Sequence, residues 1–210
     1  SGKYLFVETK APAGYVTGDP VLVEVKDINE NQMFAFINKP THVGIYKVDA
    51  KTGDTVAGAE LELYNAADYV NGEFIGEPID KWTTTLELKE FNALPVGKYI
   101  VREVSVPAGY TTAEPLEIVV EETTELQIFN LLNNKTIVSI SKLDKDTKEF
   151  LPGAEFVIYF DINNNDKVDD EDVEVGKWVS TDEAYTLEGL PVGKYILVET
   201  KAPEGYETIE

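Results

Sequence analysis

The 210-residue chain contains no cysteine and only one histidine. Extracellular domains of this size often rely on disulfides, so here the core or another device must hold the fold together. The sequence also lacks a Ser/His/Asp or Cys/His set, a Gly-rich phosphate loop and a zinc pattern. No apolar run is long enough to cross a membrane. We therefore expect neither an enzyme active site nor a membrane span in this stretch.

Basic residues are scarce as well. The chain has 18 Lys and Arg against 39 Asp and Glu, a formal net charge of −21. Such a surface repels phosphates, so we expect no nucleic-acid partner. The acidity is typical of a soluble surface and also permits cation binding. Sustained helical periodicity is absent too, although residues 86–91 could form one helical turn.

The chain does contain short alternating runs rich in Val, Ile, Tyr, Phe and Thr, punctuated by Gly, Pro, Asn and Asp. This pattern is typical of an all-β sandwich or barrel. The expected strands include 43–48, 60–64, 98–104, 116–120, 127–132 and 138–143. Trp82 and Trp178 occupy matching places in successive units, and we expect both to pack at the edge of a sandwich.

The sequence repeats itself with a period near 95 residues. A Gly-Lys-Tyr strand occurs three times, and its copies begin at Gly2, Gly97 and Gly193. Each copy leads to a Pro-x-Gly-Tyr motif, and these motifs end at Tyr15, Tyr110 and Tyr206. A unit of this length is typical of a small independent domain rather than of a solenoid repeat.

The repeat register predicts three units. Residues 1–39 are the C-terminal part of a domain, residues 40–134 a complete domain, and residues 135–210 the N-terminal part of a third domain that lacks its closing strands. Because the register does not match the chain ends, we expect the chain to be a window cut from a longer tandem array.

Three polar residue types recur on the apolar faces of strands. Side chains alternate between the faces of a strand, which places Lys47 on the same face as Val43 and Ile45. In the same way Glu103 and Asn133 continue apolar faces. The equivalent residues of the outer units are Glu8, Asn38, Lys142 and Glu199. An unpaired buried charge costs several kcal/mol, so such groups neutralise, pair or react.

Together in a dry core, Lys47, Glu103 and Asn133 can form a covalent bond. Burial favours a neutral amine, which is a nucleophile, and a neutral Glu103 can polarise the Asn133 carbonyl and pass a proton to the departing ammonia. Holding the amine and the amide close together raises the rate of a reaction that hardly occurs between the same groups in solution. A buried Lys–Glu ion pair with a hydrogen-bonded Asn is the alternative, and strand alternation does not separate the two. Asn130 and Asn134 are rival acceptors on the opposite face.

The sequence resembles the B-type domain of Gram-positive collagen adhesins and major pilins. The resemblance rests on Lys47–Gly53, Val56–Tyr64 and Leu94–Tyr110 and covers nearly the whole chain. It implies tandem transthyretin-like β-sandwich domains with reverse immunoglobulin topology. It also implies an isopeptide bond from Lys47 to Asn133 with Glu103 as the catalytic residue, and it therefore favours the covalent arrangement.

The resemblance extends to the outer units, where each has two of the three residues. Glu8 and Glu199 correspond to the catalytic glutamate, and Asn38 and Lys142 to the crosslinked residues. We expect each missing partner to lie in sequence outside this stretch, with strand exchange between neighbouring molecules as the alternative. One departure from the family pattern is Val104-Ser105-Val106 in place of Thr-Lys-Ala.

The resemblance implies a structural function, as the shaft or stalk of a bacterial surface protein. It also implies an extracellular location at the cell surface, either anchored to the cell wall or within a pilus. Its partners would be further repeats or neighbouring copies of the same polypeptide. The alternative is an adhesive module that binds a host matrix protein or a glycan through its loops.

Residues 161–172 resemble an EF-hand-type calcium loop. Oxygen ligands would come from positions 1, 3, 5, 9 and 12, which are Asp161, Asn163, Asn165, Asp169 and Asp172, and from the backbone carbonyl of Lys167. Asp166 replaces the usual Gly, position 12 is Asp rather than Glu, and no helical pattern flanks the loop. An Asn/Asp-rich surface turn is the alternative. The crosslink itself requires no cofactor.

Overall fold

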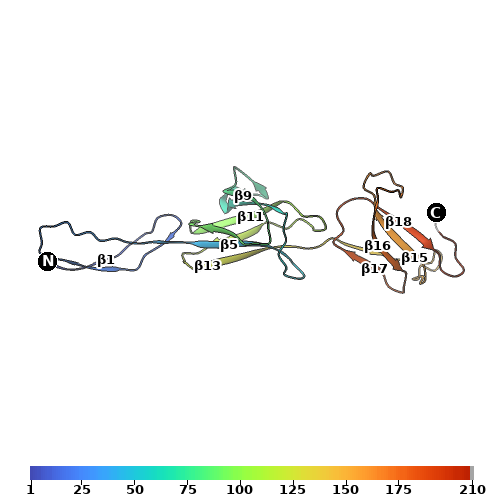
Figure 1. Ribbon diagram of the computed structural model, residues 1–210, viewed down its shortest axis with the longest axis horizontal. Helices are drawn as coiled ribbons and strands as arrows, with labels where there is room; N and C mark the ends of the chain where they lie inside the picture. Colours follow the sequence, from blue (N-terminus) through green and yellow to red (C-terminus); the bar gives the residue numbers. More distant parts are fainter. Residues whose placement is uncertain (209–210) are drawn as a thin grey trace. The chain divides into compact units, whose positions relative to one another are not determined.

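The computed structural model describes residues 1–208, and nearly all of its regular secondary structure is β-strand (Figure 1). It forms two compact units: residues 1–107 with 112–134, and residues 108–111 with the segment from 135 onward. The prediction of tandem all-β domains is confirmed. Within residues 1–208, no helix has the length and apolar character needed to span a membrane.

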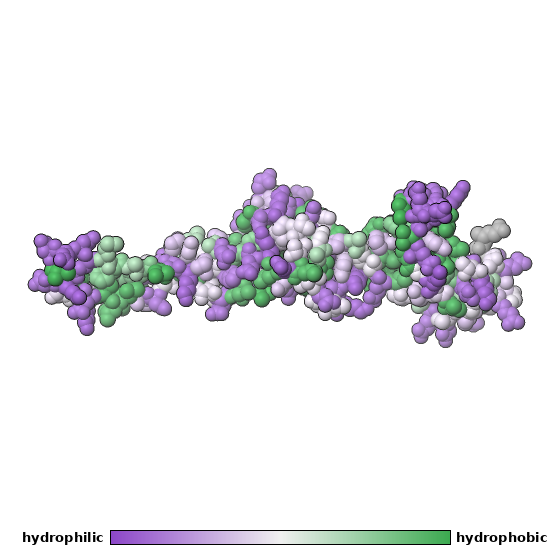
Figure 2. Space-filling model, in the orientation of Figure 1, coloured by the Kyte–Doolittle hydropathy of each residue, from purple (hydrophilic) through white to green (hydrophobic). Residues whose placement is uncertain are grey.

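The N-terminal part of the first unit is built from two antiparallel pairs. Strand β1 (Gly2–Phe6) pairs with β3 (Val21–Val25), and β2 (Tyr15–Val16) pairs with β4 (Lys39–Pro40). Large apolar side chains of this part remain exposed, including Leu5 at 61% and Leu22 at 65%, and apolar patches are visible on its surface in Figure 2. An uncovered pair of apolar strands is what part of a β-sandwich domain would present.

Residues 40–134 form a β-sandwich with a three-stranded and a four-stranded sheet. The first sheet has the order β10-β5-β13, with strands at Lys89–Asn92, His42–Asp49 and Leu126–Asn133. The second has the order β12-β11-β6-β9, with strands at Leu116–Val120, Gly97–Ser105, Glu60–Asn65 and Asp80–Thr83. A 3₁₀ turn (η1, Ala66–Asp68) and a small hairpin of β7 (Tyr69–Val70) with β8 (Glu73–Phe74) complete it.

The first and last strands of this domain lie side by side. Strand β13 pairs with β5 in parallel, in a register that joins His42 with Leu126 and Asp49 with Asn133. The chain therefore enters β5 at one end of this pair and leaves β13 at the other end.

The core lies between the two sheets and follows the alternation of the sequence. Its buried members are Val43, Ile45, Ala59, Leu61, Leu63, Leu94, Tyr99, Val101, Ile118, Val120 and Leu131. Burying one such large apolar side chain stabilises the fold by about 1.5–3 kcal/mol.

The sequence left open one helical turn at residues 86–91, and the structure has none there. Residues 89–92 form β10, an edge strand paired with β5. Phe91 packs edge-on against Trp82, with ring centroids 5.6 Å apart. Tertiary pairing therefore overrides the helix propensity of the Leu, Glu and Lys residues here.

The second unit has two small sheets. Strand β14 (Ile137–Ile140) pairs with β17 (Tyr185–Glu188), and the order β16-β15-β18 joins strands at Val173–Val179, Glu155–Phe160 and Tyr195–Lys201. The expected strand 138–143 ends at Ile140, whereas its counterpart β5 extends to Asp49 along β13. Within residues 135–208 no strand takes the place of β13 beside β14, so the end of this strand lacks a partner to pair with.

Candidate functional site

Three strands of the central domain carry a polar residue where their apolar face ends. Lys47 follows Val43 and Ile45 in β5, and Asn133 follows Leu131 in β13; Glu103 lies in β11 of the facing sheet. Their exposed fractions are 2% for Lys47, 6% for Glu103 and 0% for Asn133. The structure thus brings the three residues together inside the sandwich.

One carboxylate contacts both of the other groups. The Lys47 Nζ lies 3.5 Å from Glu103 Oε1, and the Asn133 Nδ2 lies 3.1 Å from each Glu103 oxygen. The contact to Asn133 runs through its amide nitrogen, whereas the sequence suggested one through its carbonyl. Glu103 therefore touches both nitrogens whose protonation must change if the amine displaces the amide.

Two backbone groups hold this arrangement. The N–H of Ala113 donates to Glu103 Oε2 at 2.6 Å, and the Lys47 amine donates to the carbonyl of Leu131 at 3.4 Å. Sequence reasoning did not identify either group because a backbone donor or acceptor carries no side-chain signal. The first contact recurs in the preceding repeat, where the backbone N–H of Gly18, 95 residues before Ala113, donates to Glu8 at 2.8 Å.

Burial sets the protonation chemistry of the amine. Desolvation lowers the pKa of Lys47 below its ordinary value, and the nearby Glu103 charge, which raises it, does not offset this effect. Burial therefore makes the neutral amine, the form that a nucleophilic attack requires, more accessible than it is in water.

The rival amides are placed elsewhere. Asn130 and Asn134 are exposed, whereas Asn133 is fully buried. Among the three asparagines of this segment, Asn133 alone lies in the core within reach of Glu103.

Each outer unit brings together the two members that it contains. The Asn38 amide donates to Glu8 and also to the carbonyl of Val16 at 3.0 Å. In the second unit the Lys142 Nζ lies 2.9 Å from Glu199 Oε1, with side chains only 11% and 2% exposed. The pair contacts found in the central domain recur in both partial copies.

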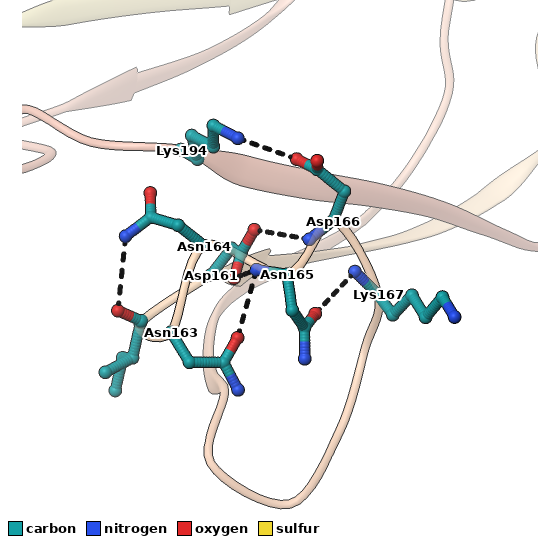
Figure 3. Close-up of polar contacts among 8 residues, drawn as sticks. Asp161, Asn163, Asn164, Asn165, Asp166, Lys167 and Lys194 are labelled. Atoms are coloured by element: carbon teal, nitrogen blue, oxygen red, sulfur yellow. Dashed lines mark hydrogen bonds and ion pairs between the residues drawn. The ribbon is translucent and has the colours of Figure 1, made fainter.

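The 161–172 loop connects β15 and β16 and is organised around Asp161, which is 2% exposed. The carboxylate of Asp161 accepts the backbone N–H groups of Asn165 at 3.1 Å and Asp166 at 3.0 Å (Figure 3). Asp166 has a φ of +62°, the left-handed conformation for which calcium loops normally use glycine at this position. The side chain of Asp166 also pairs with Lys194 at 2.9 Å.

The other predicted ligands also meet in this loop. The amides of Asn163 and Asn165 donate to Asp169 Oδ2 at 3.0 and 2.6 Å, and Asp172 accepts the backbone N–H of Asp169. Hydrogen bonds from Asn163, the Glu171 N–H and Asn165 lower the pKa of Asp169. The backbone N–H of Lys167 donates to Asn165 at 2.8 Å. In the described part of the chain, no three His, Cys, Asp or Glu side chains are grouped so that they could hold a metal ion, so the amides would have to supply part of any ligand set.

Comparison with known proteins gives one family and several solved structures. The family model SpaA, a prealbumin-like fold domain, matches residues 41–135 and 136–210. A structure of the Bacillus anthracis TIE protein is 30% identical, with a TM-score of 0.54, over 100% of this chain and 38% of that protein's chain. The chain thus spans well under half of that relative.

Two pilin structures are more distant. A streptococcal ancillary pilin is 22% identical with a TM-score of 0.39, over 99% of this chain and 68% of its own. The shaft pilin SpaA from Lactobacillus rhamnosus GG is 16% identical with a TM-score of 0.35, over 80% of this chain and 89% of its own. No curated protein matches the chain.

Proposed function

The chain belongs to the SpaA family of prealbumin-like fold domains, and on this premise we propose that it is a segment of a structural shaft or stalk in a bacterial surface protein or pilus. Each complete domain of the shaft is locked by an isopeptide bond that it forms without another enzyme. The observation that carries this proposal is the buried Glu103 carboxylate, which contacts both the Lys47 amine and the Asn133 amide.

The reaction uses only these three side chains. The Lys47 Nζ attacks Asn133 Cγ, a new Nζ–Cγ amide bond forms, and the Cγ–Nδ2 bond breaks. Glu103 accepts a proton from the attacking nitrogen and delivers it to Nδ2, which leaves as ammonia, so the carboxyl group ends as it began. The hydrogen bond from the Ala113 N–H keeps the carboxylate in place between the two nitrogens.

The strand topology makes this bond mechanically useful. Tension along the chain enters at His42 and leaves at Asn133, which are at opposite ends of the parallel β5–β13 pair. In register, Lys47 lies opposite Leu131, two residues before Asn133. A bond between Lys47 and Asn133 would therefore carry tension from β5 to the end of β13 and bypass the 85 residues between them.

The proposed setting is extracellular, on the cell surface, with attachment to the cell wall or incorporation in a pilus. The proposed partners are further repeats of the same polypeptide and neighbouring copies. Apart from forming its own crosslink, the chain carries out no catalysis in this proposal.

A shaft is expected to bind no host ligand, whereas an adhesive module binds a host matrix protein or a glycan. We expect the 210-residue chain to show no saturable binding on arrays of host matrix proteins and glycans, at concentrations where a known adhesin domain gives a clear signal. Saturable binding that is lost on substitution of exposed loop residues of the central domain would instead support the adhesive function.

We also propose that the 161–172 loop binds Ca²⁺. The carboxylates of Asp161 and Asp169 supply charge, and rotation of the Asn163 and Asn165 amides would direct their oxygens toward the position that their nitrogens now occupy beside Asp169. Bound calcium would stabilise the loop and would take no part in the isopeptide reaction.

Calorimetric titration tests the calcium proposal. We expect a dissociation constant of about 10⁻⁴–10⁻³ M, the range of extracellular calcium modules. Asp169→Ala should abolish the heat of binding, whereas Asp182→Ala, an exposed carboxylate outside the loop, should not. Absence of heat in the unaltered chain would leave the loop as an Asn/Asp-rich surface turn.

A further inference from the structure

The Pro-x-Gly-Tyr motif forms the same turn in all three repeats. Its glycine has a φ of +85° at Gly14, +86° at Gly109 and +86° at Gly205. In the first and third copies the tyrosine N–H donates to the carbonyl of the motif's proline, at 3.0 and 3.1 Å. The three loops are therefore equivalent in backbone shape, and their surroundings can be compared directly.

The first loop contacts the start of the repeat that follows it. The carbonyl of Gly14 accepts the backbone N–H of Thr41 at 2.9 Å. The Thr41 hydroxyl donates to the carbonyl of Leu94 at 2.6 Å, and the Thr41 carbonyl accepts the N–H of Ala93 at 3.0 Å. Thr41 is completely buried. Loop, threonine and the turn before the next Gly-Lys-Tyr strand thus form one hydrogen-bonded junction.

The second loop makes the same junction, within the second unit. The Thr136 N–H donates to the Gly109 carbonyl at 2.9 Å, and its hydroxyl donates to Leu190 at 2.6 Å. The Thr136 carbonyl accepts the N–H of Gly189 at 2.9 Å. This contact explains why residues 108–111, which belong to the central repeat by sequence, group with the second unit.

Close approach of two backbones explains the glycine of the motif. A Cβ atom on Gly14 would lie 2.1 Å from the Ala93 carbonyl oxygen, and one on Gly109 would lie 2.4 Å from the Gly189 oxygen. No described residue lies within 4 Å of a Cβ placed on Gly205. Gly14 and Gly109 are buried, whereas Gly205 is exposed.

The third loop is nevertheless already formed. Besides the turn hydrogen bond, the Tyr206 hydroxyl donates to Asp144 Oδ2 at 2.6 Å, which fastens the loop to its own repeat. It thus presents the Gly205 carbonyl in a turn that two equivalent loops use to bind a threonine N–H.

We propose that the Pro-x-Gly-Tyr loop is a docking element between successive repeats, and that Pro203–Tyr206 binds the start of a further repeat of this type. Its occupant is recognised by a threonine three residues after the closing-strand asparagine, the spacing of Thr41 from Asn38 and of Thr136 from Asn133. The occupant also supplies a turn that precedes a Gly-Lys-Tyr strand. The inference depends on backbone contacts, so it stands or falls independently of the isopeptide bond.

The test begins with the junction present in the 210-residue chain. Gly109→Ala should speed hydrogen exchange of the Thr136 amide at least about tenfold, because the added methyl group displaces the docked turn. Gly205 has the same φ as Gly109, but no described atom lies near its added methyl group. Gly205→Ala should therefore leave the exchange rate of the Thr136 amide unchanged. Equal exchange at Thr136 in both variants would show that the junction does not depend on the loop and would overturn the proposal.

The third loop is tested by extending the chain from Tyr206 with a second copy of residues 111–206. This extension supplies closing strands and a new repeat start. We expect the amide of the added threonine to be protected, and Gly205→Ala now to speed its exchange at least about tenfold. Gly153→Ala is the matched control, since Gly153 also has a positive φ, +95°, and no close neighbour. The proposal would be refuted if the amide of the added threonine exchanged as fast as in an unstructured peptide, or if Gly205→Ala did not change its exchange rate.

Discussion

A stretching force applied to the ends of the chain is expected to release no length between Lys47 and Asn133 in the wild-type central domain. The proposed isopeptide bond would close this segment, so its strands could not extend even if their hydrogen bonds broke. The segment contains 87 residues, counted from 47 to 133. Without the bond, these residues would extend to about 290–310 Å.

The matching variant is Asn133→Ala, which removes the carbon that the amine attacks. Single-molecule force spectroscopy should then show a new unfolding event whose contour length approaches that figure. Asn130→Ala is the control, because Asn130 is an exposed residue of the same strand and its substitution would leave the proposed bond in place. The mechanical account fails if wild type and Asn133→Ala release the same length.

The second large effect is expected in the free energy of unfolding. A crosslink that closes a loop of 87 residues restricts the unfolded chain, and the loop-entropy relation assigns it about 4–5 kcal/mol. Glu103→Gln and Asn133→Ala each prevent the bond but remove different contacts. We therefore expect the free energy of unfolding of both variants to fall by at least this amount in denaturant titrations, whereas Asn130→Ala should stay within about 0.5 kcal/mol of wild type.

The pH dependence of that loss identifies its source. In Asn133→Ala the Lys47 amine still titrates, and burial keeps its pKa in the folded state below the ordinary 10.5. Between these two pKa values the unfolded state binds more protons than the folded state, so the free energy of unfolding rises with pH in that window. Asn133→Ala combined with Lys47→Met should lack this rise. Wild type should also lack this rise, because the Lys47 nitrogen is then part of an amide and does not titrate. Identical pH profiles for Asn133→Ala and for Asn133→Ala with Lys47→Met would argue against a buried titrating amine.

Much of this architecture could be predicted from the sequence because strand alternation has a period of two. Alternation placed Lys47 with Val43 and Ile45, and the structure buries all three side chains. The strand 116–120 has the expected bounds. The 95-residue spacing then located the equivalents of the polar residues without any structural information.

Other features depend on contacts between segments far apart in sequence, and these could not be predicted. Lys142 was expected within a strand, but β14 ends at Ile140 because no counterpart of β13 lies beside it among the described residues. The docking of Thr41 on Gly14 requires the backbone of three separate segments. The glycine of the Pro-x-Gly-Tyr motif could be recognised in the sequence, but the backbone carbonyl that lies against it, from Ala93 or Gly189, could not be predicted.

Intact-mass measurement of the purified 210-residue chain tests the central claim most directly. The account predicts a mass lower than the sequence mass by one ammonia in wild type, and the full sequence mass in Lys47→Ala, Glu103→Ala and Asn133→Ala. Peptide mapping should recover Lys47 and Asn133 in one branched fragment. A wild-type chain with its full sequence mass would contradict the account and leave the three residues as a buried ion pair with a hydrogen-bonded amide.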